Sequence, residues 1–195
     1  MMKLAIFASG SGTNFQAIVD AVKKGDIQAN IEVLVCDKTD AKVIERAANE
    51  QIDCFVFQPK KYENKAEYEK EILAVLQKRE IDFIALAGYM RLVGSTLLQA
   101  YQHRIINIHP SLLPSFPGKD AIGQAIRAGV KVTGVTIHYV DEGMDTGPII
   151  AQQAVSILEN DTEETLAMRI HEVEHALYTK VLKEMLGHYI GGSLK

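Results

Sequence analysis

Short apolar runs alternate with segments of helical periodicity along most of the chain. The runs rich in Val, Ile and Phe cover residues 4–8, 31–36, 54–57, 82–87 and 104–108. The helical segments begin at about residue 14, cover residues 42–50 and 65–79, and include a short one near Thr96. Strands and helices in alternation form βαβ units. The pattern therefore predicts an α/β fold, a Rossmann-like open and mostly parallel twisted sheet with helices on both faces.

The alternation changes after Pro117. A predicted helix over residues 120–128 is followed by two strand-like runs, 134–140 and 148–157, with only the turn 141–147 between them. Strands joined by so short a connection pair in antiparallel orientation, because a parallel pair needs a long crossover. We therefore expect antiparallel strands near the C-terminal end of the sheet.

The chain closes with a predicted long C-terminal helix. Asp161 and Glu164 have the spacing of a capping box at its start. Apolar residues then recur at helical spacing, which predicts an amphipathic helix that docks on the sheet. These residues are Leu166, Ile170, Val173, Leu177 and Val181.

Size and charge narrow the class of protein. The chain has 195 residues, 47% of them hydrophobic, which predicts one core: a single domain over residues 1–190 with a frayed tail at 191–195. A formal net charge of -4 disfavours nucleic-acid binding. No apolar stretch approaches the roughly 20 residues that cross a bilayer, so we expect no membrane partner. Cys36 and Cys54 match no disulfide or zinc-ligand spacing, which predicts a reducing, cytoplasmic location.

The first candidate site is a glycine-rich turn between the first predicted strand and helix. Its sequence is Ser9-Gly10-Ser11-Gly12-Thr13-Asn14, and small residues at a helix N-terminus let backbone N–H groups surround a phosphate. Phe15 occupies a position where the dinucleotide-binding fingerprint requires glycine, and the turn lacks the lysine of a P-loop. The same residues would also serve as plain turn formers with a helix cap. The turn alone leaves both interpretations open.

The second candidate site is where the fifth predicted strand ends, at Asn107 and His109. Residues two apart on a strand share a face, so both side chains would point to the carboxyl edge of the sheet, where open α/β sheets bind ligands. An amide donor and an imidazole suit acyl transfer. Asp145, in the turn 141–148, is the third candidate. A structural histidine and a solvated acidic turn would give the same pattern, and these alternatives stay open.

The last predicted helix contains His171-Glu172-Val173-Glu174-His175, which matches the HxxEH pattern of one metallopeptidase class. That class needs a further acidic ligand on another helix, whereas the acidic residue after His175 is Glu184 on the same helix. We therefore expect no metal. Glu174 and His175 are expected to line a ligand cleft or to bond with neighbouring loops.

Four segments in this order resemble the folate-dependent formyltransferases. They are Gly10-Ser11-Gly12-Thr13-Asn14, Ala87-Gly88-Tyr89-Met90-Arg91, Asn107-Ile108-His109-Pro110-Ser111-Leu112-Leu113-Pro114 and Asp145-Thr146-Gly147-Pro148. The family's signature is an Asn, a His and an Asp acting around the formyl group, and Asn107, His109 and Asp145 match it. The first turn, the match at Glu174-His175-Ala176 and coverage of essentially the whole chain point to the branch that formylates glycinamide ribonucleotide.

The resemblance implies roles for the matched residues. Gly12, Thr13 and Asn14 would hold the substrate phosphate, and Glu174 would contact the ribose. The pterin of the co-substrate, 10-formyltetrahydrofolate, would lie against two segments. They are Met90, Arg91, Leu92 and Val93, and Asp141, Glu142, Gly143, Met144 and Asp145. Lys65 replaces an arginine that relatives often use for the glutamate tail, and lysine makes a point-charge contact instead of a fork.

The implied reaction is formyl transfer to the amine of glycinamide ribonucleotide in purine synthesis, with small molecules as partners, no metal, and a monomer or homodimer. Another folate-dependent formyltransferase or a formyltetrahydrofolate hydrolase is an alternative, although a hydrolase would have no use for a phosphate turn. A noncatalytic nucleotide-binding module would explain the turn but not the pairing of Asn107 with His109. A metallopeptidase would use His171 and His175 with zinc.

Overall fold

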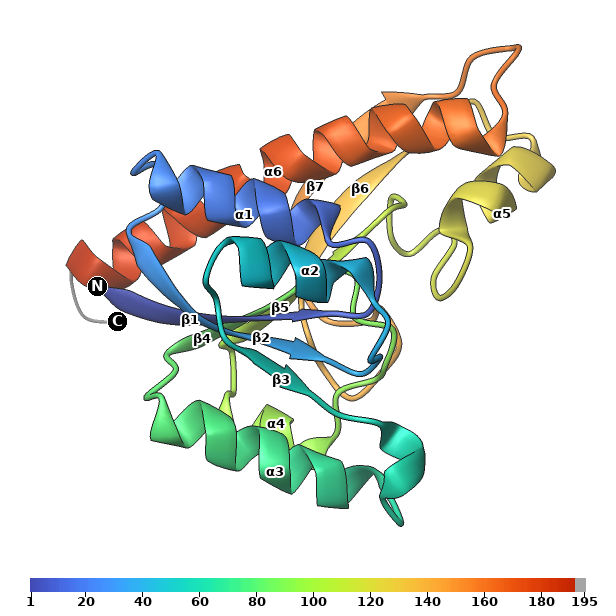
Figure 1. The fold of residues 1–195 in the computed structure, drawn as a ribbon. Coiled ribbons are helices and arrows are strands. Elements are labelled where there is room, and N and C mark those ends of the chain that lie inside the picture. The colour runs from blue at the N-terminus through green and yellow to red at the C-terminus, as the bar shows by residue number, and fades with distance from the viewer. Residues whose placement is uncertain (192–195) are drawn as a thin grey trace.

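The structure, a computed structural model, describes residues 1–191 (Figure 1). Within them, a seven-stranded sheet has the order β3-β2-β1-β4-β5-β6-β7. The strands are β1 (Met2–Ala8), β2 (Ala29–Cys36), β3 (Cys54–Val56), β4 (Phe83–Leu86), β5 (Ile105–His109), β6 (Val132–Tyr139) and β7 (Ile149–Ser156). The helices are α1 (Thr13–Lys23), α2 (Lys42–Asn49), η1 (Pro59–Lys61), α3 (Lys65–Lys78), α4 (Ser95–Ala100), α5 (Ala121–Ala128) and α6 (Glu163–Gly191). The tail expected to be frayed, 191–195, lies outside the described residues apart from Gly191, where α6 ends.

The sheet confirms the predicted fold class. Strands β1 to β5 run parallel, whereas β6 is antiparallel to β5 and β7 is antiparallel to β6. Every strand and helix expected from the sequence is present with shifts of a few residues at the ends, and the short helix η1 is additional. The strand order reverses between β1 and β4. Open α/β sheets bind their ligands at such a switch point, outside the carboxyl ends of the strands.

Helices cover both faces of the sheet because the central strands are apolar on both sides. In β1, Leu4, Ile6 and Ala8 belong to one hydrophobic cluster and Ala5 and Phe7 to another, and all five are fully buried. Figure 1 shows α1, α2 and α6 on one face and α3 and α4 on the other, while α5 lies near the start of α6. Strands buried on both faces have the near-continuous apolar sequence seen in β1.

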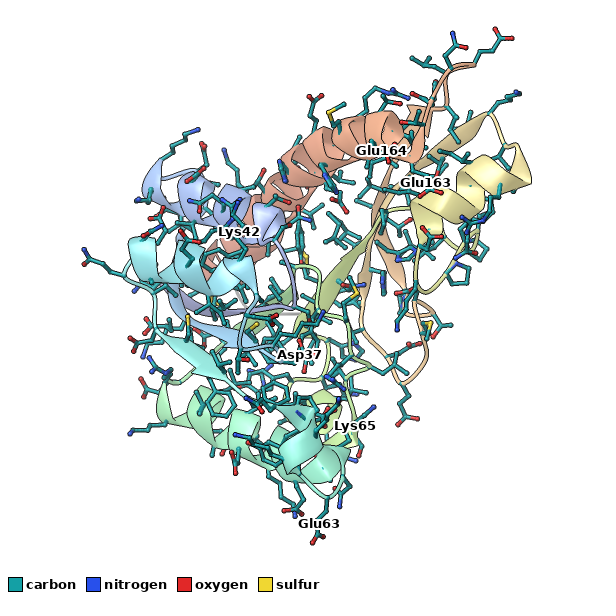
Figure 2. All side chains as sticks on the ribbon, turned by 45° about the vertical axis from the view of Figure 1, so that its right-hand side comes forward. Asp37, Lys42, Glu63, Lys65, Glu163 and Glu164 are labelled. Atoms are coloured by element: carbon teal, nitrogen blue, oxygen red, sulfur yellow. The ribbon has the colours of Figure 1, made fainter. Side chains whose placement is uncertain are left out.

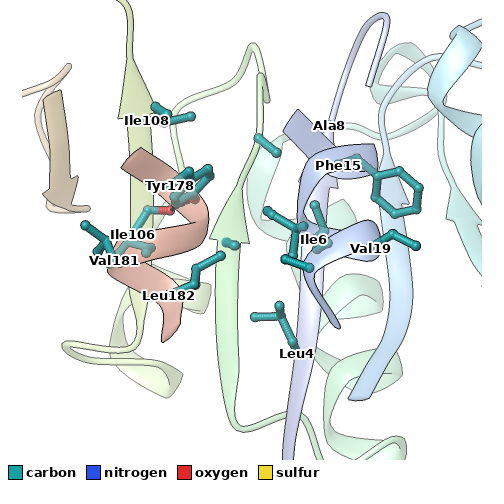
Figure 3. Packing of buried hydrophobic residues seen from close by; sticks show 14 of the residues in the cluster. Leu4, Ile6, Ala8, Phe15, Val19, Ile106, Ile108, Tyr178, Val181 and Leu182 are labelled. Carbon is teal, nitrogen blue, oxygen red and sulfur yellow. Dashed lines mark hydrogen bonds between the residues drawn. The ribbon is translucent and has the colours of Figure 1, made fainter. Parts of the chain in front are cut away.

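Helix α6 is attached to the sheet by apolar side chains and one hydroxyl group. Tyr178, Val181 and Leu182 lie over Ile106 of β5 (Figure 3). The buried Tyr178 hydroxyl lies 2.9 Å from the carbonyl oxygen of Leu86 and 3.3 Å from that of Ile106, so burying it leaves no unpaired polar group. Full burial of a Val, Leu or Ile side chain, as at Leu182 and Ile106, stabilises the fold by about 1.5–3 kcal/mol.

The predicted apolar stripe of the last helix is confirmed. Leu166, Ile170 and Val181 are buried, and Val173 and Leu177 pack against the same cluster at partly buried positions. The stripe covers one side of the helix, and exposed charged residues cover the other. Within residues 1–191, no helix combines the length and the apolar character needed to cross a membrane.

The start of α6 differs from the prediction, which joined Asp161 to Glu164. Reciprocal bonds instead link Thr162 and Thr165, whose backbone N–H groups each donate to the other's hydroxyl oxygen at 3.0 and 3.3 Å. The Asp161 carboxylate pairs with the guanidinium group of Arg169, at 2.8 Å between Oδ1 and Nη1. Two capping registers one residue apart fit the sequence. The Asp161 carboxylate accepts from Arg169, from the Thr165 hydroxyl and from the N–H of Leu158, and Thr162 makes the reciprocal bonds of the cap.

Candidate active site

A cleft of about 630 Å³ opens at the carboxyl ends of β1, β4 and β5, at the switch point of the sheet. Strand β1 leads into the glycine-rich turn, β4 leads into the segment 87–93, and β5 ends with Asn107 and His109. The β6–β7 connection contributes residues 143–145, and α6 contributes His171 and Glu174. A concave site of this volume fits a small organic ligand.

The glycine-rich turn forms one end of the cleft, where residues 10–14 line the wall at the N-terminus of α1. Gly12 has a φ of 74°, and a Cβ atom there would lie 2.5 Å from the side chain of Val43 in α2. Glycine alone therefore fits both the backbone and the space. Within the described chain, no side chain caps α1. Its first N–H groups are thus available to an anion.

The structure brings Asn107, His109 and Asp145 together in the middle of the cleft. Asn107 and His109 come from β5, and the β6–β7 loop brings in Asp145. Asp145 Oδ2 lies 3.4 Å from His109 Nδ1 and accepts a 2.8 Å bond from the N–H of Gly118, while Oδ1 lies 3.7 Å from His138 Nε2. His109 is only 5% exposed. These groups therefore interact more strongly than they would in water.

The carboxyl group of Asp145 is held in its charged form. Burial by itself raises its pKa, but the nearby His138 ring, the bond from Gly118 N–H and the nearby His109 ring together bring the pKa below its usual value. The residue has a φ of 57°, a left-handed conformation that aspartate tolerates better than most residues. This fixed carboxylate faces Nδ1 of the His109 ring.

Both ring nitrogens of His109 have partners in this structure. Nδ1 faces Asp145, and Nε2 lies 2.8 Å from the carbonyl oxygen of Phe116. Because a carbonyl oxygen can only accept, Nε2 carries a proton and donates a hydrogen bond to the Phe116 carbonyl. The backbone of Phe116 has a φ of 54°, which is unusual for a bulky side chain. A substrate oxygen can accept a hydrogen bond from Nε2 only if it replaces this carbonyl oxygen.

His138 is a cleft residue that the predicted site omits. Its Nδ1 donates to the carbonyl of Tyr139 at 2.8 Å, and its Nε2 lies 3.2 Å from Asn107 Nδ2. In the neutral ring, Nε2 therefore accepts one N–H of the Asn107 amide and leaves the other for a ligand. Asn107 and His138 are direct partners in the β5–β6 pairing. That register depends on how the strands meet, and neither strand sequence alone reveals it.

The other end of the cleft is built from the residues that follow β4. Met90, Arg91, Leu92 and Val93 all line it. Met90 is 62% exposed and Leu92 is 43% exposed, and Met144, which lines the cleft from the β6–β7 loop, is 51% exposed. Apolar side chains gathered at the mouth of a cavity form a surface for an apolar ring system.

Three residues proposed for this end do not line the cleft. Lys65 lies exposed at the start of α3. Asp141 accepts bonds from Gly143 N–H at 3.1 Å and from the Thr146 hydroxyl at 2.7 Å, and so shapes the loop from within. Glu142 is exposed on the same loop. Gly143, Met144 and Asp145 are the members of that loop segment that face the cleft.

Glu174 enters the cleft from α6, where it is 6% exposed and accepts a 3.3 Å bond from Asn14 Nδ2. Burial raises the pKa of its carboxyl to about 7, against the smaller opposing effect of Asn14. The cleft lining includes His171 instead of the expected His175, whose pKa is lowered by burial. Among the side chains that the structure describes, those of residues 1–187, no three of His, Cys, Asp or Glu are grouped so that they could hold a metal ion.

A Rossmann-like sheet with an amide, an imidazole and a carboxylate grouped at its switch point is the architecture of an enzyme for small molecules. The family model described as formyl transferase matches residues 2–182. The chain belongs to this family.

Named relatives resemble the chain over nearly its whole length. A phosphoribosylglycinamide formyltransferase of Bacillus subtilis is 62% identical over 96% of each chain. The crystal structure of glycinamide ribonucleotide transformylase 1 from Geobacillus kaustophilus is 66% identical, with a TM-score of 0.93 over 95% of this chain and 99% of that one. A chloroplastic phosphoribosylglycinamide formyltransferase of Vigna unguiculata is 42% identical over 94% of this chain, which spans 60% of that longer protein.

Proposed function

We propose that this chain transfers the formyl group of 10-formyltetrahydrofolate to the amine of 5-phosphoribosylglycinamide, in the purine biosynthetic pathway. The products are formylglycinamide ribonucleotide and tetrahydrofolate. The observation that carries the proposal is a single cleft that joins an anion-binding helix N-terminus, an Asn–His–Asp group and an apolar mouth. The similarity to phosphoribosylglycinamide formyltransferases over nearly the whole chain supports the same substrate pair.

The reaction begins with attack of the substrate amine on the formyl carbon. The new C–N bond gives a tetrahedral intermediate whose oxygen carries a negative charge. Asn107 donates its free amide N–H to this oxygen, and protonated His109 donates from Nε2 once the oxygen has displaced the Phe116 carbonyl. The bond from the formyl carbon to N10 of the folate then breaks. No covalent bond to the enzyme is required.

Proton transfer completes the exchange, because the amine loses one proton and N10 of the folate gains one. Asp145 lies 3.4 Å from His109 Nδ1 and favours the charged ring. A carboxylate at this place can also accept the proton from the amine, directly or through a water molecule, and pass it on. Asp145 therefore serves both charge stabilisation and proton relay.

The ribonucleotide occupies the end of the cleft formed by α1 and α6. Its phosphate lies against Gly12, Thr13 and Asn14, where free N–H groups and the helix dipole favour an anion. Glu174 accepts from the ribose hydroxyl groups. The carboxylate is the form that accepts, so ribose binding favours loss of the proton that burial retains.

The folate occupies the other end. The pterin lies between residues 90–93 and residues 143–145 of the β6–β7 loop, and the apolar side chains of Met90, Leu92 and Met144 lose water contact when the ring binds. Lys65 contacts the glutamate tail of the folate in this proposal, because it lies outside the cleft at the start of α3 and so away from the pterin. The folate is a co-substrate, and the proposed reaction needs no metal ion.

The proposal includes further assignments. Residues 1–190 act as one formyltransferase domain, the location is the cytoplasm, and the chain works as a monomer or homodimer with small-molecule partners. Neither a nucleic acid nor a membrane takes part. The net charge of -4 supports the exclusion of nucleic acid.

The deciding experiment supplies 10-formyltetrahydrofolate with and without glycinamide ribonucleotide and follows the release of tetrahydrofolate. We expect release that depends on the ribonucleotide, with formylation of its amine in equal amount. Release at the same rate without the ribonucleotide would identify a formyltetrahydrofolate hydrolase instead. No turnover of either compound would overturn the proposal.

A further inference from the structure

We propose that two buried carboxylates outside the cleft, Asp37 and Glu69, are positioning residues that hold the two ends of the segment 90–94 and thereby set the affinity for the folate. The inference rests on the proposed function only in naming the folate as the ligand of this segment. Neither carboxylate lines the cleft.

Asp37 holds the first end. It lies directly after β2, is 5% exposed, and is drawn among the inward-lying side chains of Figure 2, whereas Glu63 extends from the outer edge. Its Oδ2 accepts a 2.7 Å bond from Arg91 Nε, and its Oδ1 accepts from the hydroxyl of Ser9. The Ser9 oxygen in turn accepts the N–H of Met90 at 2.9 Å. One carboxylate therefore fixes the Arg91 side chain directly and the Met90 backbone through Ser9.

Glu69 holds the second end from α3. It is 2% exposed, and its Oε1 accepts a 2.6 Å bond from the N–H of Gly94, the residue that caps α4. A Cβ atom on Gly94 would lie 2.7 Å from Glu69 Oε2 and 2.8 Å from Lys65 Cδ. Glycine at this position thus permits the close approach of the carboxylate. Gly94 has no side chain to cap α4, so Glu69 supplies the cap from a neighbouring helix.

The segment between these ends has no regular secondary structure. Val93 is buried in the core, but the side chains of Met90 and Leu92 are 62% and 43% exposed, so packing fixes Val93 and does little to fix the other two. Charge-assisted hydrogen bonds at both ends limit the backbone conformations of the free protein. A binding surface ordered in advance avoids the entropy cost of ordering it on binding, and affinity rises accordingly.

Stability alone does not explain why two carboxylates are buried at these positions. A buried charge costs solvation free energy that its hydrogen bonds only partly offset. Glu69 Oε2 is buried without a hydrogen-bond partner among the described residues, and burial raises the pKa of this carboxyl. A function in holding Gly94 explains why a carboxylate is there.

The kinetic test compares alanine and amide variants at each position. Asp37→Ala and Glu69→Ala should each raise the KM for 10-formyltetrahydrofolate about tenfold, with the KM for the ribonucleotide and kcat changed less than about twofold. Glu69→Gln should stay within about threefold of the parent, because its amide oxygen accepts at the same place. Asp37→Asn keeps one of two acceptor oxygens, so its KM for the folate should lie between those of the parent and Asp37→Ala. Matched controls are Asp40→Ala, exposed in the same loop as Asp37, and Glu71→Gln, exposed on the same helix as Glu69.

A ligand-free measurement separates this inference from the proposed function. Hydrogen exchange of the Met90 and Gly94 amides should be about tenfold faster in Asp37→Ala and Glu69→Ala respectively, and unchanged in the controls. If an alanine variant fails to fold, Ser9→Ala serves for the first end, since it frees the Met90 N–H and retains both carboxylates. Folded variants with parental exchange and folate KM would overturn the inference, as would equal rises in both KM values. A parent that transfers no formyl group would overturn the proposed function alone.

Discussion

The two ends of the cleft are built in opposite ways. At the end proposed for the ribonucleotide, Asn14 is 9% exposed and Glu174 is 6% exposed, so polar groups are buried without any ligand. At the folate end, Met90, Leu92 and Met144 are apolar and 62%, 43% and 51% exposed.

The contrast shows two sources of binding free energy. The buried polar end keeps hydrogen-bonding atoms with incomplete partners, among them Asn14 Oδ1, which has none among the described residues. A ribose hydroxyl can donate to such an oxygen, and a phosphate can accept from the uncapped N–H groups of α1. The exposed apolar end gains when a flat ring removes its side chains from water. Changes at the two ends should therefore affect different substrates, and changes between them should affect both.

The largest effect is expected between the two ends, at Asp145. Asp145→Asn retains the volume, the left-handed backbone and an oxygen for Gly118 N–H, but it removes the charge that supports protonated His109. We expect kcat to fall by about 10²- to 10³-fold. Steady-state kinetics with both substrates, beside a thermal unfolding curve, measure this. A folded variant with parental turnover would remove Asp145 from the mechanism and leave Asn107 and His109.

The next effect belongs to the buried polar end and depends on pH. The pKa of Glu174 rises from 4.5 to about 7 on folding, so the folded state binds the proton more tightly. This stabilisation is complete below pH 4.5 and is lost as the pH rises through 7. Glu174→Gln has no such proton to lose. Relative to the parent, the ligand-free variant should gain about 3 kcal/mol in free energy of unfolding between pH 4 and pH 8.

Urea unfolding at both pH values measures this gain. A parallel pH dependence of the parent and Glu174→Gln would show that Glu174 titrates normally, and that the polar end is wetter than its burial suggests. Leu92→Ala, at the exposed end, is the control and should show the parental pH dependence.

A smaller effect should distinguish the two ends by substrate. Gly12→Ala places a Cβ atom in a left-handed backbone and against Val43, so the turn must shift. We expect the KM for the ribonucleotide to rise about tenfold and the KM for the folate to change less than about twofold. Gly25→Ala is the matched control, because Gly25 has a φ of 79° just beyond the other end of α1, with open space around it.

Leu92→Ala should show the opposite preference, with a rise of about threefold in the KM for the folate alone. Equal changes in both KM values for Gly12→Ala would mean that the turn is only scaffolding. The contrast between the two ends would then fail.

The last prediction is that removing metal ions has no effect on the rate. Exhaustive chelation should leave the rate of formyl transfer unchanged, because the proposed donors at both ends and in the middle are protein groups. A loss of activity that added zinc restores would assign a role to His171 and His175 and revive the metal alternative.

The sequence by itself determined the order of the elements and the place of the cleft. Strand and helix periodicity are local properties, and the alternation of buried strands with amphipathic helices already implied a mostly parallel sheet. The carboxyl ends of parallel strands share one edge, so the turn after β1 and the pair Asn107 and His109 had to meet there. The spacing in 141–147 likewise implied the antiparallel pair β6 and β7.

Tertiary structure alone decided which groups face one another. His138 lies opposite Asn107 only through the β5–β6 register, and His109 meets the Phe116 carbonyl only through the path of the intervening loop. Asp37 and Glu69 are ordinary acidic residues in the sequence, and their burial beside the segment 90–94 gives them a role. The choice between Asp161 and Thr162 as the cap likewise became visible only in the hydrogen bonds of the folded chain. Secondary-structure propensity depends on neighbouring residues, whereas hydrogen bonds between residues far apart in the chain depend on how the packed layers bring them together.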